Sequence, residues 1–147
     1  MVDASCIGRV YAPYTVAVLP LDLVRFAAAI GETHPEYVDA DVARAAGHPG
    51  LPIPPTFASC LEMKRPAPFE WLRELGIDVT RVLHGAQSFH YLAPVYAGDV
   101  LTFSARIIDV AVRRKGALIF IVRESGVTNQ HGASVMQFRS TIIVRAA

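Results

Sequence analysis

The chain has 147 residues and a formal net charge of +1, and 52% of its residues are hydrophobic against 18% charged. This length suits one domain built on one core, and this composition excludes intrinsic disorder. A net charge so close to zero argues against a general nucleic-acid-binding protein, which would carry a basic surplus. We therefore expect a single domain over residues 1–147 that does not bind nucleic acid.

The sequence also indicates a compartment and an assembly state. Its start lacks a basic region followed by an apolar run, and no apolar stretch reaches the roughly 20 residues of a membrane span. Two cysteines are too few for a disulfide framework. These features predict a cytoplasmic protein without a membrane segment. The mean hydropathy of +0.35 is high for so small a chain, so we also expect a dimer or a larger assembly.

The first half of the chain predicts one short strand followed by helices and loops. Residues 14–18 alternate weakly and favour a strand, and Pro20 opens a run with helical spacing that stops at Gly31. A second short helix is expected over residues 39–47. The segment 48–56 holds four prolines, which exclude regular structure there.

Residues 56–64 predict a central apolar helix, for which Thr56 is a plausible N-cap. Phe57, Cys60 and Leu61 fall on one stripe at helical spacing. Cys60 is therefore expected to lie in the core and not to act as a nucleophile.

The second half of the chain predicts strands. Long β-branched or alternating runs cover residues 82–95, 100–112, 117–128 and 133–145. A polar turn over residues 113–116 and a hairpin connection over residues 129–132 separate the last three. Strands joined by short turns predict an antiparallel meander.

Histidines are scattered along these elements. His84 and His90 share a strand face by parity but stand roughly 20 Å apart at about 3.3 Å per residue, too far to bind one metal ion. His48 and His131 fall on expected loops. We therefore expect no metal site.

Three segments resemble the MaoC-like dehydratases, in particular the N-terminal type of that domain. They are FAAAIGETHPEYVDADVARAAGHPG (26–50), IPPTFASCLEM (53–63) and HGAQSFHYLAPVYAGDVLTF (84–103). The likeness extends over about residues 5 to 145. It implies an α+β hot-dog fold, in which a long antiparallel sheet wraps around a central helix, and whose open edge strand invites a partner.

The resemblance also implies a reaction. Members of the family hydrate trans-2-enoyl thioesters of coenzyme A or acyl carrier protein, or dehydrate the 3-hydroxy form, without a metal or redox cofactor. An Asp and a His on the loop after the first helix activate the water, and a backbone N–H at the start of the central helix polarises the thioester carbonyl. This chemistry needs a base, an acid and a donor to the developing oxyanion.

The catalytic positions of this sequence depart from that pattern. In GETHPEYVD, Glu32 stands at the position of the Asp, His34 at that of an Asn, and Tyr37 at that of the His. A tyrosine, whose ordinary pKa is near 10, rarely serves as a base at neutral pH. Glu32 and His34 either form a shifted catalytic dyad with Tyr37 as a donor, or serve the loop itself, with Glu32 solvated or capping and His34 filling it.

The predicted substrate-binding positions are also altered. Pro55 stands where the alignment puts the donating glycine of the family, and proline has no backbone N–H. Thr56 or Phe57 would have to donate instead. The basic turn either meets the phosphates of coenzyme A or carrier protein or is a solubilising hairpin tip; its residues are Arg113, Arg114 and Lys115. Three large apolar residues either line an acyl tunnel or pack as a lid; they are Phe69, Trp71 and Leu72.

Three functions follow from these departures. The favoured one is the degenerate half of an acyl-thioester dehydratase, paired with a second hot-dog chain that carries the intact Asp and His. The second is a self-sufficient homodimeric enoyl-CoA hydratase that uses Glu32 and His34. The third is a binding module that holds acyl thioesters without turning them over.

Overall fold

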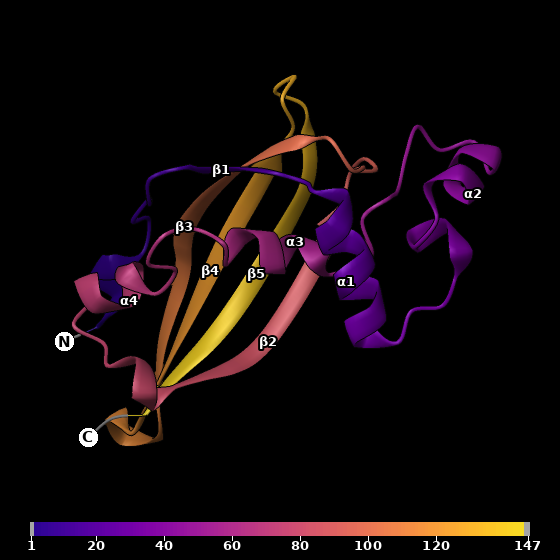
Figure 1. Ribbon diagram of the computed structural model, residues 1–147. Helices are drawn as coiled ribbons and strands as arrows, with labels where there is room; N and C mark the ends of the chain where they lie inside the picture. Colours follow the sequence, from indigo (N-terminus) through magenta and orange to yellow (C-terminus); the bar gives the residue numbers. More distant parts are fainter. Residues whose placement is uncertain (1, 146–147) are drawn as a thin grey trace.

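A computed structural model describes residues 2–145 of the chain (Figure 1). The strands are β1 (Tyr14–Ala17), β2 (Val82–Tyr91), β3 (Val100–Arg113), β4 (Leu118–Thr128) and β5 (Ser134–Arg145). The α-helices are α1 (Pro20–Ile30), α2 (Ala40–Ala45), α3 (Phe57–Glu62) and α4 (Glu70–Glu74). Short 3-10 turns are η1 (Ala4–Cys6), η2 (Pro35–Tyr37), η3 (Val79–Arg81) and η4 (Arg114–Gly116). Within residues 2–145, no helix is long and apolar enough to cross a membrane.

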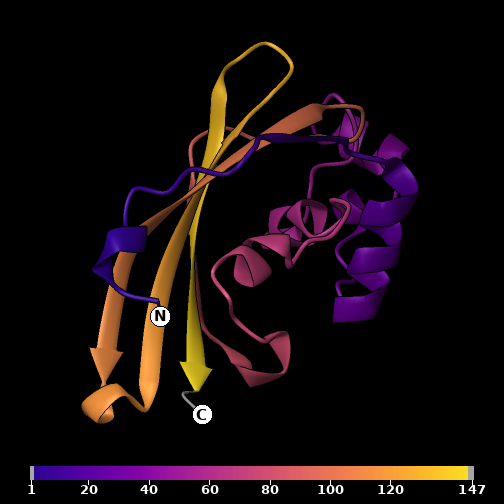
Figure 2. The ribbon, with the colours of Figure 1, turned by 90° about the vertical axis from the view of Figure 1, so that its left-hand side faces the viewer.

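The five strands form one antiparallel sheet in the order β1-β3-β4-β5-β2. The sheet curves around α3, and the four α-helices lie on the same side of it (Figures 1 and 2). The predicted α+β arrangement of a long antiparallel sheet around a central helix is therefore confirmed. The expected meander consists of the three strands β3, β4 and β5. β2 pairs with β5, and the chain between Tyr91 and Val100 crosses the end of the sheet, so that β4 and β5 lie between β2 and β3.

The first helix follows its local signals. Leu23 and Ala27 are fully buried, as their spacing on one helix face predicts. Gly31 ends α1 in the left-handed conformation, with φ of 73°, and its N–H donates to the carbonyls of Ala27 and Ala28. This cap fixes where the loop with Glu32 leaves α1.

The central helix is shorter than expected, and its buried face includes Phe57 and Leu61 as predicted but not Cys60. α3 spans six residues, and its buried apolar positions are Phe57, Ala58 and Leu61. Cys60 is exposed, so its predicted place in the core is wrong. The helix turns about 100° per residue, and the stripe through Ala58 and Leu61 leaves Cys60 on the open side. Thr56 occupies the N-cap position, but its side chain makes no capping hydrogen bond.

A β-bulge in β2 changes which side chains share a face. The register with β5 shifts between His84 and Ala86. His84 Nε2 consequently lies 3.1 Å from Gln87 Oε1, on the side of the sheet that faces the helices. His90 alternates to the other face, so the prediction of a face shared by His84 and His90 is wrong.

Candidate functional site

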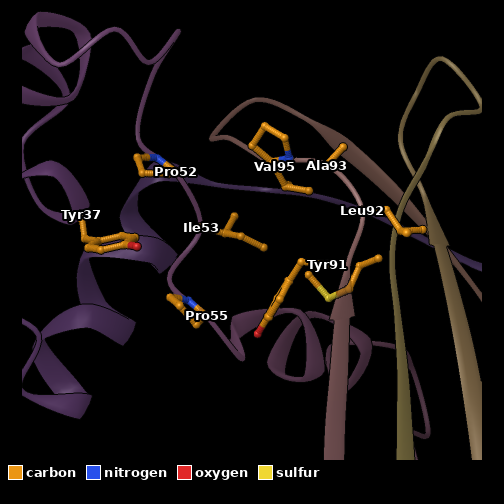
Figure 3. Close-up of a pocket in the computed structure, with 10 residues that line it drawn as sticks. Tyr37, Pro52, Ile53, Pro55, Tyr91, Leu92, Ala93 and Val95 are labelled. Atoms are coloured by element: carbon orange, nitrogen blue, oxygen red, sulfur yellow. The ribbon is translucent and has the colours of Figure 1, made fainter.

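An apolar cavity of about 400 Å³ lies where the proline-rich segment meets the end of β2 (Figure 3). Its walls come from η2, from the proline-rich segment before α3, and from the chain around the end of β2. The lining residues are Tyr37, Pro52, Ile53, Pro55, Tyr91, Leu92, Ala93, Pro94, Val95 and Met136. Two tyrosine hydroxyls are the side-chain polar groups of this lining. We refer to it below as the Tyr37 pocket.

Tyr37 is the one member of the predicted catalytic trio that lines this pocket. Its ring is carried by η2, two residues after Pro35, and the ring of His34 meets it edge-on at a centroid distance of 6.2 Å. The His34 side chain is exposed and does not belong to the lining. The structure therefore brings Tyr37 to the cavity and leaves His34 outside it.

The Glu32 carboxylate serves the backbone of its own loop. Glu32 Oε1 accepts a hydrogen bond of 2.8 Å from the backbone N–H of His34. Within residues 2–145, no hydrogen bond joins this carboxylate to the His34 ring. The geometry matches the capping carboxylate that the sequence left as an alternative, and it offers no support for a Glu32–His34 dyad.

The start of α3 keeps one backbone donor near the pocket. Thr56, and not Pro55, has the left-handed backbone that favours glycine, with φ of 73°. Its N–H donates to the Tyr91 hydroxyl at 3.3 Å. The Phe57 N–H is already used, because it donates to the carbonyl of Pro54 at 3.2 Å. The left-handed position that favours glycine thus falls at Thr56 and not at Pro55, and its N–H is engaged by the Tyr91 hydroxyl.

A hydrogen-bonded trio that the sequence did not indicate joins the helical loop to the connection between β2 and β3. His48 Nε2 lies 3.3 Å from a Glu36 carboxylate oxygen, and His48 Nδ1 lies 3.3 Å from the Tyr96 hydroxyl. The three residues are 12 and 48 positions apart, so no local spacing could have signalled the contact. Both ring nitrogens of His48 are engaged, which leaves neither free for a water or a substrate.

The basic turn lies far from the Tyr37 pocket. Across the sheet, Tyr91 of β2 is level with Phe103 of β3, because Tyr91 pairs with Met136 of β5, Met136 with Val127 of β4, and Val127 with Phe103. Arg113 ends β3 roughly 30 Å further along at about 3.3 Å per residue, and Figure 1 shows this hairpin at the end of the sheet away from α1 and α2. Arg113, Arg114 and Lys115 are therefore separated from Pro55, Thr56 and Phe57, with which the sequence had grouped them.

A second cavity, of about 330 Å³, lies between α3, α4 and the sheet. Phe69, Trp71 and Leu72 all line it; Trp71 and Leu72 are also buried in the core, whereas Phe69 is exposed. The two readings of these residues, as tunnel lining and as packing, are thus compatible. The polar side chains of this cavity are Ser59, Glu62, His84, Gln87, Arg123 and Ser140. We refer to it below as the Arg123 cavity.

Comparison with known proteins shows the family of this chain. Residues 5–138 match the FAS1-like dehydratase domain region. The chain belongs to this family. A UPF0336 protein of Streptomyces griseus is 36% identical over 146 residues, which cover 99% of this chain and 96% of that protein. A UPF0336 protein of Clavibacter michiganensis is 39% identical over 142 residues, covering 94% of this chain and 92% of that protein.

Solved structures agree with the fold. The truncated HadBC (3R-hydroxyacyl-ACP dehydratase) complex of Mycobacterium tuberculosis contains a chain with a TM-score of 0.80 and 27% identity, covering 94% of this chain and 96% of that one. The MaoC-like dehydratase of Rhodospirillum rubrum gives a TM-score of 0.71 at 15% identity, and the match covers 96% of this chain and 93% of that one. The fold is that of the MaoC-like hot-dog dehydratases, as the resemblance implied.

Proposed function

We propose that this chain is the non-catalytic half of a two-chain dehydratase that interconverts 3-hydroxyacyl and trans-2-enoyl thioesters. Its partner is a second hot-dog chain that carries the water-activating Asp and His. One observation carries the proposal: the Glu32 carboxylate is committed to the backbone of His34, and the His34 ring stands outside the Tyr37 pocket. A hydratase site needs a base and an acid at the reacting carbons, and the lining of this pocket offers neither a carboxylate nor an imidazole.

The long open edge of the sheet supports pairing with another chain. β2 contacts β5 on one side, and within residues 2–145 no strand lies on its other side. Large apolar side chains along and just beyond this strand are exposed, with Leu83 and Tyr91 at 50% and Leu92 at 53%. An uncovered edge of ten residues with apolar side chains is a favourable site for strand pairing. The HadBC likeness, at 27% identity, is to a chain of a complex.

The thioester of coenzyme A or acyl carrier protein is the expected ligand. The Tyr37 pocket is apolar, and the Tyr91 hydroxyl in its lining accepts from the Thr56 N–H and can donate its own O–H to a carbonyl oxygen. The Arg123 cavity offers a further apolar volume behind α3 for the acyl chain. In this role the chain positions the substrate while its partner performs the proton transfers.

Hydration of crotonyl-coenzyme A tests the proposal. The rate is measured for this chain alone, for a candidate partner with the intact Asp and His alone, and for the mixture. The expected result is no turnover by this chain and a higher rate for the mixture than for the partner alone. Full activity of this chain alone, or a mixture no faster than the partner, would refute the two-chain assignment.

A further inference from the structure

The Arg123 cavity contains two buried nitrogen donors without partners. Within the described residues, the Gln87 amide nitrogen and Arg123 Nε are fully buried and have no hydrogen-bond acceptor. Both residues line the same cavity. We propose that this cavity binds an aliphatic chain that carries a neutral oxygen, a carbonyl or a hydroxyl, and that these two N–H groups hold that oxygen. That the chain is an acyl chain rests on the proposed function; the oxygen preference rests on the cavity itself.

The hydrogen bonds of Gln87 use its amide oxygen and leave its amide nitrogen without a partner. The Ser140 hydroxyl donates to Gln87 Oε1 at 2.6 Å, and His84 Nε2 lies 3.1 Å from the same oxygen. The bulge in β2 creates this arrangement, because it puts His84 and Gln87 on one face. With its oxygen saturated from two sides, the amide has only its N–H groups left to offer.

Arg123 is held just as firmly. Its Nη1 and Nη2 donate to the two carboxylate oxygens of Glu62 at 3.2 and 2.9 Å, and its side chain is 9% exposed. The ring of Trp71 lies 5.3 Å from the guanidinium carbon. The Ser125 hydroxyl also donates a hydrogen bond of 2.8 Å to Glu62 Oε1. Fixed from these directions, the guanidinium cannot turn its Nε toward another acceptor.

The charge balance selects a neutral oxygen. Arg123 and Glu62 already cancel within the bidentate pair, so a carboxylate ligand would add an uncompensated negative charge to a poorly solvated space. The remaining walls are largely apolar, including Phe69, Leu72 and Ile142, and suit the carbons on either side of that oxygen. A saturated chain would leave both donors unpaired, which is unfavourable in a buried site.

Binding of small probes to the full chain tests this without any catalysis. Dibutyl ketone is compared with its hydrocarbon isostere, in which a methylene group replaces the carbonyl oxygen, and with nonanoate. Affinity is measured by titration, and nitrogen-resolved NMR follows the side-chain N–H signals of Gln87 and Arg123. We expect the ketone to bind about tenfold more tightly than the isostere, as two modest hydrogen bonds allow, and to shift both signals.

Two variants separate the role of the amide from general effects. Gln87→Leu removes one of the two hydrogen bonds and should reduce the ketone preference to about threefold, whereas Gln137→Leu, a matched change on the opposite face of the sheet, should leave the tenfold preference intact. Equal binding of ketone and isostere, no binding of either, or an undiminished tenfold preference in Gln87→Leu would overturn the proposal. Tighter, Gln87-dependent binding of nonanoate would overturn the choice of a neutral oxygen. A failed hydration assay beside intact ketone selectivity would refute the proposed function alone.

Discussion

The backbone N–H of Thr56 donates to the hydroxyl of Tyr91 at 3.3 Å, which joins the start of α3 to the end of β2. Thr56 holds a left-handed backbone to make this contact, with φ of 73°. A β-branched residue in that region is an outlier, and such strain concentrates at functional sites. Here the strained residue hydrogen-bonds Tyr91, which lines the Tyr37 pocket.

Thr56→Gly should therefore stabilise the chain by about 1 kcal/mol, because glycine adopts the left-handed region without a steric penalty. Thr56→Ala keeps a Cβ atom and should stay within about 0.5 kcal/mol of the wild type, since Thr56 makes no side-chain cap. Urea unfolding of both variants measures the difference. A glycine variant less stable than the alanine variant would show that the backbone at Thr56 is unstrained.

The buried Glu62–Arg123 pair supplies a second prediction. Glu62→Gln removes the charge that balances a guanidinium with 9% exposure, and should lower the free energy of unfolding by about 3–5 kcal/mol. Glu70→Gln is the matched control, because the Glu70–Arg73 pair lies at the surface and contributes little. Equal losses in the two variants, measured by urea unfolding, would contradict the importance of the buried pair.

Glu124 on the other face of the sheet makes stability depend on pH. Burial raises the pKa of its carboxyl, but hydrogen bonds from Arg106 and Arg139, at 2.9 and 2.8 Å, outweigh it and hold that pKa below its usual 4.5. A carboxylate whose pKa is lower in the folded chain stabilises the fold above the unfolded pKa and loses this effect as pH falls through the folded pKa.

Glu124→Gln should thus cost about 1–2 kcal/mol at pH 7, since both arginines are more than half exposed and screened. The cost should shrink on acidification below about pH 4.5. Urea unfolding of wild type and variant across this range measures it. A cost that stays constant or grows toward low pH would contradict the ion-pair account.

Local signals were enough to predict much of the fold. Pro20 and Gly31 bracket α1 as the sequence indicates, and the hairpin over residues 129–132 joins β4 to β5 as expected. These features depend on propensities within a few residues, where glycine and proline restrict the backbone most strongly.

The remaining features depend on distant contacts. β2 and β5 are more than 40 residues apart in the sequence, and no local signal predicts their pairing. The bulge at Gly85 also depends on this partner strand, because a Cβ atom at Gly85 would lie 2.9 Å from the Ile143 side chain. The Glu36–His48 contact likewise joins residues on separate turns of the helical loop. In the candidate site, the capping role of Glu32 was one of two alternatives that spacing alone could not separate.

The open β2 edge predicts a position-specific effect on assembly. Leu83→Asp should abolish pairing with a second hot-dog chain, because it puts a charge on the apolar edge. Val112→Asp is the control: Val112 is 48% exposed, close to the 50% of Leu83, but lies on β3. Light scattering after size-exclusion chromatography follows complex formation. Loss of the complex in the control alone would place the interface elsewhere.

The central claim, that this chain supplies no acid–base group, is tested most directly in the reconstituted pair. The kcat for crotonyl-coenzyme A hydration is compared after replacing Glu32 by Gln together with His34 by Ala in this chain, and after replacing the catalytic histidine of the partner chain by Ala. We predict a change within about twofold for the first and a loss of about 10²–10⁴-fold for the second. A hundredfold loss from the Glu32 and His34 replacements would contradict the claim.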